Sequence, residues 1–185
     1  MATQQQPKYW TYADLLDLPE DGKRYEIIDG VLYEMPSANS THAVIIMNLI
    51  VKVLSPVVFA LGGQLLTAPL DVFLRGGNPV QPDLIVLLPE QLGMISDRGI
   101  EGAPALLVEV LSPSNSRHDL VTKRALYARA RVQEYWIVSP EAMSIEILTL
   151  DGDVYRTRAR LACDEPITSA LFPTIATPTS VIFDR

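Results

Sequence analysis

The order of apolar and polar residues along the N-terminal part of the chain predicts a short helix followed by a hairpin. Residues 11–18 have helical spacing, with a Thr cap at the start and a stop at Pro19. Two strand-like runs, 24–28 and 31–35, flank Asp29-Gly30. A two-residue Asp-Gly loop is a strong hairpin signal. We therefore expect these two runs to pair with each other.

The next part of the chain predicts a long helix and two strands. Ser40 or Thr41 caps a segment whose apolar residues recur at three- and four-residue steps, and the helix should end near Leu61. Residues 64–74 then read as one extended strand, which a turn at 76–79 joins to the apolar run 84–88. We expect these two strands to form a hairpin.

The second half of the chain predicts a strand, a crossover helix and another strand. Residues 105–111 resemble a strand buried on both faces, 116–130 are helical, and 134–138 form another apolar run. Two further strands, 144–150 and 154–161, should pair across a second Asp-Gly turn. We expect a mixed α/β fold, in which the helices near 40–61 and 116–130 flank a central sheet.

Length and composition indicate one domain. The chain has 185 residues, of which 48% are apolar and 20% charged, which excludes an intrinsically disordered chain. We expect a single domain over 1–185, with a flexible tail over about residues 1–10. Neither a signal sequence nor an apolar run of about 18 residues is evident, so we expect a cytoplasmic location without a membrane. The only cysteine, Cys163, excludes an internal disulfide.

The net charge of −7 argues against a protein that binds nucleic acid through its overall charge. A local basic groove stays possible, because Arg117, Arg124, Arg129 and Arg131 gather on and just after the helix near 116–130.

Four acids interrupt apolar strands, and an ionised carboxylate removed from water costs several kcal/mol unless it is paired or coordinated. They are Glu26, Asp71, Asp83 and Glu109. Taken singly, Asp83 could end a turn, Glu109 could pair with a buried arginine, and Glu26 and Asp71 could face water. If the acids converge, they must share a proton or bind a cation, and hard oxygen ligands suit Mg²⁺ or Mn²⁺. Such a cation could support metal-assisted phosphodiester hydrolysis.

A cationic partner for these acids could come from the helix after Glu109. Asp119, Lys123 and Tyr127 are four residues apart and share one helical face, so Lys123 could point back toward the strand ends. An ordinary exposed Asp-Lys pair would explain the same spacing.

Two short motifs, Pro82-Asp83 and Glu109-Val110-Leu111, resemble the PD-(D/E)XK nuclease superfamily, although its usual lysine position falls on Leu111. A wider set of motifs is similar to the bacterial Uma2 family of endonucleases over about residues 10–150. These motifs are Tyr25-Glu26-Ile27-Ile28-Asp29-Gly30, Gln81-Pro82-Asp83, Val108 to Ser114, Lys123 with Tyr127, and Glu134-Tyr135-Trp136.

The resemblance implies a restriction-endonuclease-like core and a site where Asp71, Asp83 and Glu109 meet. Asp83 and Glu109 would hold Mg²⁺ or Mn²⁺, together with the Val110 carbonyl, and Asp71 would be a further metal ligand. Lys123, moved to the next helix, would activate the attacking water or steady the scissile phosphate of DNA. Glu26 and Tyr127 would be supporting residues, and we expect a homodimer. His42, just inside the helix near 40–61, could support the site by donating to a phosphate or orienting a water, or could be a capping or packing histidine.

Arg156, Arg158 and Arg160 alternate along one predicted strand and should share one face, from which they could contact a phosphate backbone. An exposed sheet face would explain them equally well. Two rival functions stay open. One is a catalytically degenerate nuclease fold retained as a binding or assembly module, which the acidic charge and Leu111 favour. The other is a carboxylate-pair glycoside hydrolase, for which the aromatic residues are few.

Overall fold

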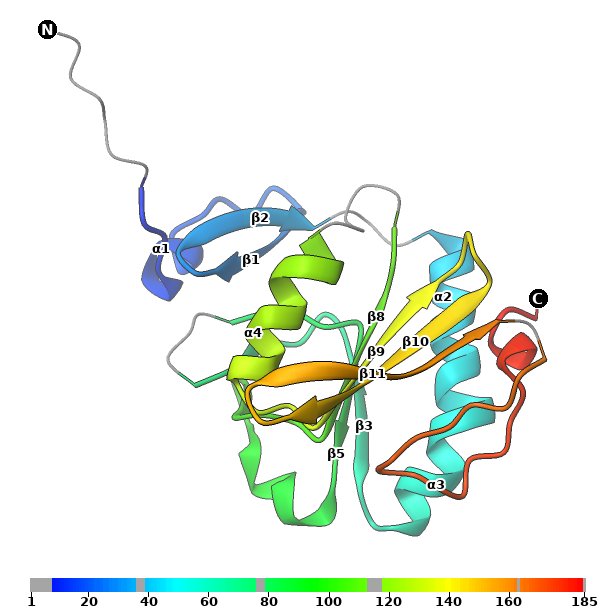
Figure 1. Cartoon of the computed structure of the whole chain (residues 1–185). Helices are drawn as coiled ribbons and strands as arrows, with labels where there is room; N and C mark the ends of the chain where they lie inside the picture. Colours follow the sequence, from blue (N-terminus) through cyan, green and yellow to red (C-terminus); the bar gives the residue numbers. More distant parts are fainter. Residues whose placement is uncertain (1–7, 36–38, 76–78, 113–117, 163, 185) are drawn as a thin grey trace, which may run out of the picture.

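In the computed structural model, six strands form a central mixed sheet in the order β11-β10-β9-β8-β5-β3 (Figure 1). The strands β8 and β9 are parallel, and the other neighbouring strands are antiparallel. Their bounds are β3 Gln64–Thr67, β5 Leu84–Leu87, β8 Leu106–Val110, β9 Glu134–Ser139, β10 Ser144–Asp151 and β11 Val154–Ala162. The expected mixed α/β architecture is confirmed.

The structure describes residues 8–35, 39–75, 79–112, 118–162 and 164–184. Most of the predicted turn at 76–79, the first seven residues of the predicted tail, Pro113 to Arg117 and Cys163 lie outside these ranges. The side chains of residues 118–120, including Asp119, also lie outside the description.

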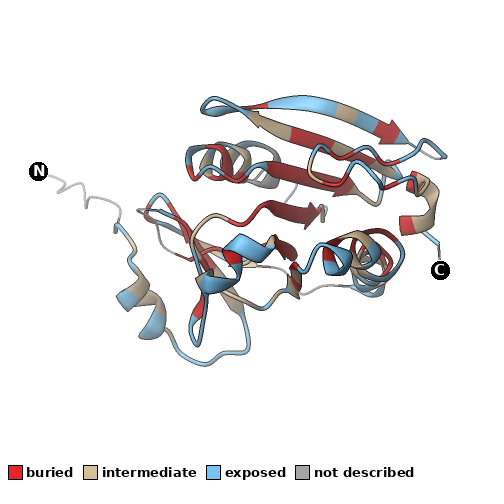
Figure 2. Ribbon diagram, turned by 90° about the horizontal axis from the view of Figure 1, so that it is seen from below, coloured by how far each residue is buried: buried red, intermediate tan, exposed pale blue. Residues whose placement is uncertain are grey.

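Helices cover both faces of the sheet, and the strand alternation divides the core between them (Figures 1 and 2). On β5, Leu84 and Val86 join the cluster beneath the long helix, whereas Ile85 and Leu87 join the cluster beneath α4. The long helix consists of α2 Ser40–Asn48, the π-helical η1 Leu49–Leu54 and α3 Ser55–Ala60. The opposite face carries the π-helical η3 His118–Lys123 and α4 Arg124–Arg129.

Local caps explain where the helices begin. The helix α1, Tyr12–Leu16, starts with the predicted Thr11 cap, whose side chain accepts the backbone N–H of Asp14. The cap of α2 differs from the prediction, because the side chain of Asn39, not Ser40 or Thr41, accepts the backbone N–H of His42. Asn is as good an N-cap residue as Ser or Thr. The sequence pattern alone therefore does not decide which of Asn39, Ser40 and Thr41 caps the helix.

The predicted hairpin is confirmed as β1, Arg24–Ile28, paired with β2, Val31–Met35. Asp29 and Gly30 both have positive φ, as an Asp-Gly turn of this kind requires. This hairpin is a two-stranded sheet of its own and does not pair with the central sheet.

The single strand expected over 64–74 is wrong. The strand β3 ends at Thr67, and the chain then enters a separate three-stranded sheet through β4, Val72–Phe73. Its partners in that sheet are β7 Gly99–Glu101 and β6 Ile95–Ser96, which follow a 3-10 helix, η2 Pro89–Met94. Pro69 has no N–H to donate to a strand ladder, which is the physical reason for the interruption.

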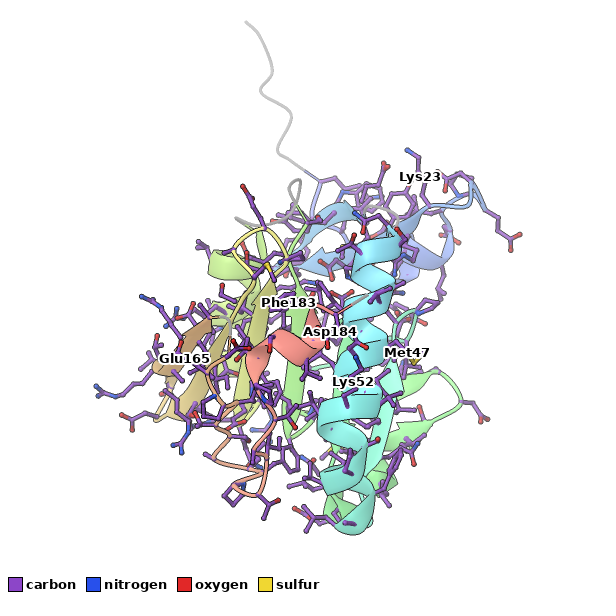
Figure 3. The ribbon with its side chains drawn as sticks, turned by 90° about the vertical axis from the view of Figure 1, so that its right-hand side faces the viewer. Lys23, Met47, Lys52, Glu165, Phe183 and Asp184 are labelled. Atoms are coloured by element: carbon purple, nitrogen blue, oxygen red, sulfur yellow. The ribbon has the colours of Figure 1, made fainter. Side chains whose placement is uncertain are left out.

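The C-terminal segment, left unassigned by the pattern, packs against the long helix through η4, Thr179–Ile182 (Figure 3). The Asn48 amide donates to the backbone carbonyls of Ile182, at 3.2 Å, and Asp184, at 2.8 Å. Lys52 Nζ lies 3.7 Å from a carboxylate oxygen of Asp184. These contacts fix the C-terminal segment to the long helix, and Ile182 joins the core cluster beneath that helix.

By length and composition, the helix Ser40–Ala60 could cross a membrane, with a mean hydropathy of 2.3. Core helices of soluble proteins meet the same criteria, and Leu49, Val53 and Val58 of this helix are buried against the sheet. The expectation of a protein without a membrane therefore stays a prediction.

Candidate active site

Asp83 and Glu109 lie at the same end of two adjacent strands. In the antiparallel β5-β8 pair, Leu84 is opposite Val108, so one further step of this register places Asp83 opposite Glu109. Residues opposite each other on antiparallel strands have Cβ atoms about 5 Å apart. The Asp83 carboxylate also accepts the backbone N–H of Val110, at 2.8 Å. The structure therefore places these two predicted acids opposite each other at the same end of the two strands.

His42 approaches Asp83 from the first turn of α2. Its Nε2 lies 3.0 Å from Asp83 Oδ2, and both side chains are less than one-fifth exposed. The cap at Asn39 fixes the backbone of His42, so the imidazole is carried to Asp83 by a held helix start. His42 thus lies at the predicted site, as a hydrogen-bond partner of Asp83.

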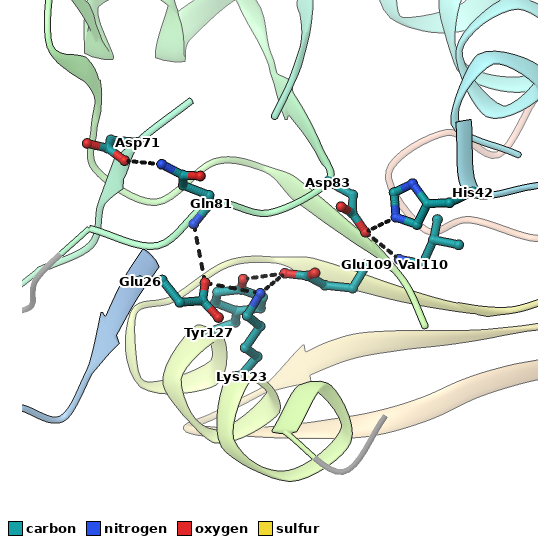
Figure 4. A network of polar contacts seen from close by, with 9 residues as sticks. All are labelled: Glu26, His42, Asp71, Gln81, Asp83, Glu109, Val110, Lys123 and Tyr127. Carbon is teal, nitrogen blue, oxygen red and sulfur yellow. Dashed lines mark hydrogen bonds and ion pairs between the residues drawn. The ribbon is translucent and has the colours of Figure 1, made fainter. Parts of the chain in front are cut away.

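Glu109 receives two donors from the opposite helical layer (Figure 4). Lys123 Nζ lies 2.9 Å from Glu109 Oε1, and the Tyr127 hydroxyl donates to the same oxygen at 2.7 Å. Burial, followed by the negative charge of Glu109, raises the pKa of the Tyr127 hydroxyl well above its ordinary value. Tyr127 therefore stays protonated and keeps its donor role.

Lys123 reaches Glu109 although it is fourteen residues away in the chain. Leu111 occupies the usual lysine position of the motif, and its backbone N–H bonds to the Val138 carbonyl on β9. The prediction that a lysine on the following helix points back to the strand end is confirmed, and the alternative of an exposed Asp-Lys pair is wrong because Lys123 is fully buried.

Glu26 enters the same cluster from the hairpin. Its Oε2 lies 3.2 Å from Lys123 Nζ and accepts the backbone N–H of Gln81 at 3.4 Å. Glu26 has no exposed surface, so the possibility that it faces water is excluded.

Asp71 is held apart from this cluster. Its Oδ1 accepts the side-chain amide of Gln81 at 2.9 Å, and Figure 4 shows Gln81 between Asp71 and Glu26. Within the described ranges, no three His, Cys, Asp or Glu side chains form a group that could hold a metal ion. The expected meeting of Asp71 with Asp83 and Glu109 is therefore not found, because Asp71 precedes β4, which turns into the separate sheet.

Gln81 is a site residue that sequence reasoning did not assign, although it opens the Gln81-Pro82-Asp83 motif. Because its amide nitrogen donates to Asp71, its other terminal atom is Oε1, which is buried and has no hydrogen-bond partner in the described part of the chain. The sequence could not predict that Gln81 Oε1 lacks a hydrogen-bond partner, because the orientation of this amide depends on where Asp71 lies in the fold.

The donor set fits a hydrated Mg²⁺ or Mn²⁺ and not a zinc cage. Mg²⁺ usually binds one or two carboxylates and keeps several waters, so it does not need a group of three protein ligands. Asp83 and Glu109 supply hard carboxylate oxygens at adjacent positions, and Gln81 Oε1 is a further oxygen that nothing described donates to. These oxygens match the ligand type that such cations prefer.

The three strand arginines do not share a face. The β10-β11 register shifts at Arg158, so Arg156 lies opposite Thr149 whereas Arg160 lies opposite Glu146. The flanking core residues confirm the switch, since Tyr155 packs into the α4 side of the core and Leu161 into the α2 side. An extra residue in a β-bulge reverses the alternation that the prediction assumed.

Two of these arginines also have acidic partners. Arg156 pairs with Asp151, and Arg160 Nη2 lies 3.1 Å from Glu146. The expected contact of these arginines with a nucleic acid stays a prediction. Any such contact would involve arginines on more than one face of the sheet.

The profile of the Uma2 family, described as "Putative restriction endonuclease", matches residues 12–180. Among solved structures, the chain is similar to a putative nuclease belonging to DUF820 from Anabaena variabilis, with a TM-score of 0.77 and 19% sequence identity. The match covers 94% of this chain and 97% of the other. At this identity, the structural likeness supports the fold alone. No curated protein matches the sequence.

Proposed function

Because the chain belongs to the Uma2 family of restriction-endonuclease-like proteins, we propose that it hydrolyses DNA phosphodiester bonds with Mg²⁺ or Mn²⁺. The observation that carries this proposal is the strand register that places Asp83 opposite Glu109, together with the buried ammonium group of Lys123 at 2.9 Å from Glu109. Acids beside a cationic donor at one strand end match what phosphodiester hydrolysis requires.

Each residue has a distinct role in the proposal. Asp83 and Glu109 would hold the cation, with the Val110 carbonyl beside them. When bound, the cation would orient a water and neutralise charge that develops on the phosphoryl oxygens. His42 keeps Asp83 oriented through its 3.0 Å contact, and Tyr127 does the same for Glu109 through its hydroxyl.

Lys123 would contribute positive charge near the scissile phosphate. Its Nζ is already held between two carboxylates, so the side chain does not have to be ordered when the substrate binds. A buried ammonium group interacts more strongly with developing negative charge than one in water does. The homodimer and the cytoplasmic location remain predictions beside this proposal.

DNA cleavage by the purified protein tests the proposal. Supercoiled plasmid and single-stranded DNA are incubated with Mg²⁺, with Mn²⁺ or with a chelator, using the parent, Glu109→Ala and Lys123→Ala. We expect cleavage only by the parent with metal, and a loss of about 100-fold or more in both variants. Asp164→Ala, which removes an exposed acid, is the matched control and should cleave like the parent.

Equal cleavage by all four proteins would indicate a contaminating nuclease and contradict the proposal. Absence of metal-dependent cleavage by the parent would favour the rival function, a nuclease fold retained as a binding or assembly module.

A further inference from the structure

We propose that Glu26 is a positioning residue for Lys123, so that the N-terminal hairpin β1-β2 completes the active site. This inference rests on the proposed function and assigns a catalytic purpose to a sheet that does not pair with the nuclease core.

The hairpin is fixed to the core by a few specific contacts. The backbone N–H of Ile27 donates to the Pro79 carbonyl at 3.5 Å, and Ile28 is buried among the residues beneath α4. At the tip, the Arg129 guanidinium binds both carboxylate oxygens of Asp29, at 2.9 and 3.0 Å. The hairpin is thus docked through three consecutive residues, Ile27, Ile28 and Asp29, and Glu26 directly precedes them on β1.

Glu26 carries a buried carboxylate into the core interior. Its side chain has no exposed surface, and the two apolar residues that follow it on β1, Ile27 and Ile28, are buried as well. A carboxylate that only helped to fold a hairpin would be expected at the surface, since burial of a charge costs several kcal/mol. Its contacts with Lys123 and with the Gln81 backbone link the hairpin to the helix layer and to the Gln81-Pro82-Asp83 segment.

Two carboxylates from different sheets hold one ammonium group. Glu109 comes from the central sheet and Glu26 from the hairpin, and their oxygens lie 2.9 and 3.2 Å from Lys123 Nζ. A lysine side chain is a flexible four-carbon stem, so a single partner would not fix its end. If Glu109 also binds a cation, Glu26 is a second carboxylate that keeps Lys123 in place.

Lysine-selective ¹⁵N NMR tests this inference without any catalytic activity. The chain has four lysines, Lys8, Lys23, Lys52 and Lys123. The first three side chains are at least 40% exposed and Lys123 is fully buried, so only Lys123 should give an ammonium signal that exchanges slowly with water. The disappearance of this slowly exchanging signal in Lys123→Met would assign it to Lys123.

We expect Glu26→Ala to speed the proton exchange of the Lys123 ammonium by at least about tenfold, because a hydrogen-bond acceptor is lost. Glu26→Gln should shift the signal and keep its exchange slow, because an amide oxygen can still accept the bond. Glu34→Ala is the matched control, since Glu34 is an exposed acid on the same hairpin whose 2.8 Å partner is Lys23. It should leave the Lys123 signal unchanged.

The kinetic arm uses the same variants in the DNA cleavage assay. Misplacement of a catalytic group by about 1 Å can cost about 100-fold in rate, so Glu26→Ala should lower kcat by that order with little change in KM. Glu26→Gln should recover at least a tenth of the parent kcat.

A folded Glu26→Ala protein with unchanged Lys123 exchange and parent kcat would overturn the inference. If Glu26→Ala does not fold, an unshifted Lys123 signal in Glu26→Gln overturns it equally. If the parent itself does not cleave DNA, the proposed function fails, while the NMR comparison still decides whether Glu26 holds Lys123.

Discussion

Replacement of Lys123 by methionine should destabilise the protein more than any exposed charge replacement. Lys123 Nζ lies 2.9 Å from Glu109 and 3.2 Å from Glu26, and at most 3% of any of the three side chains is exposed. At an effective dielectric constant near 20, each of these pairs contributes an attraction of about 5 kcal/mol, offset by the cost of burying the charges. Methionine fills a similar volume, so the main change is the loss of the charge.

The net cost follows from the two carboxylates that remain. Removal of one partner from a buried ion pair typically costs about 3 to 5 kcal/mol, because the remaining charge stays uncompensated. For a chain of this length, such a loss lowers Tm by about 6 to 20 °C. Lys52→Met is the control, because Lys52 is exposed and its 3.7 Å pair with Asp184 should be worth less than about 1 kcal/mol.

Urea titration near neutral pH measures both variants against the parent. The triple variant Lys123→Met, Glu26→Gln and Glu109→Gln should recover most of the loss, because it leaves no buried charge in the cluster. If Lys123→Met alone lies within about 1 kcal/mol of the parent, the buried ion cluster does not exist in the form described and the reasoning is refuted.

Three further predictions concern other parts of the molecule. Glu134 is fully buried and accepts bonds from Trp136 Nε1 at 3.0 Å, Ser169 Oγ at 2.8 Å and the Ala170 N–H. Glu134→Ala should therefore cost about 2 to 4 kcal/mol and speed amide hydrogen exchange at residues 169–172, and unchanged exchange there would count against it. Gly99→Ala should lower the free energy of unfolding by at least about 2 kcal/mol, because φ at Gly99 is +141° and a Cβ would collide with the Asp71 carbonyl. Gly152 has φ of +61° and open space around it, so Gly152→Ala should lower it by about 1 kcal/mol. Equal melting temperatures of the two variants would contradict this. Burial raises the pKa of the Tyr127 and Tyr155 hydroxyls above their ordinary value of 10.0. The contribution of these protonated hydroxyls to the stability of the folded protein is therefore complete below pH 10.0, and it is lost as pH rises from there toward their pKa values in the folded protein. Tyrosinate absorbance should show these two ionising only with unfolding, and ionisation of all seven tyrosines near pH 10 in the folded protein would refute it.

Local signals in the sequence were sufficient wherever one short segment decides the structure. The Asp29-Gly30 turn between two strand-like runs specifies the hairpin, since both turn residues must tolerate positive φ. The apolar runs around Glu109 and Trp136, joined by a helical segment, specify parallel strands β8 and β9. The helical spacing also made Lys123 a candidate partner of Glu109, but it fitted an exposed Asp-Lys pair as well, and only the packing of the helix against the sheet decided between the two.

Predictions failed where distant residues decide the outcome. Asp71 was expected at the metal site, but β4 pairs with β7, which is more than twenty residues later in the chain. The face of Arg156 and Arg160 depends on a bulge opposite Ile147 and Leu148, which strict alternation cannot reveal. The burial of Glu26 depends on how the hairpin docks, and no local pattern encodes that docking.

Calorimetric titration of Mn²⁺ into the parent, Asp83→Ala and Glu109→Ala tests the central claim most directly. We predict one saturable site in the parent and affinity weakened by at least about tenfold in each variant, since each loses one carboxylate ligand. Heat signals that are the same in all three proteins, or absent from the parent, would contradict a divalent cation held between these two strands.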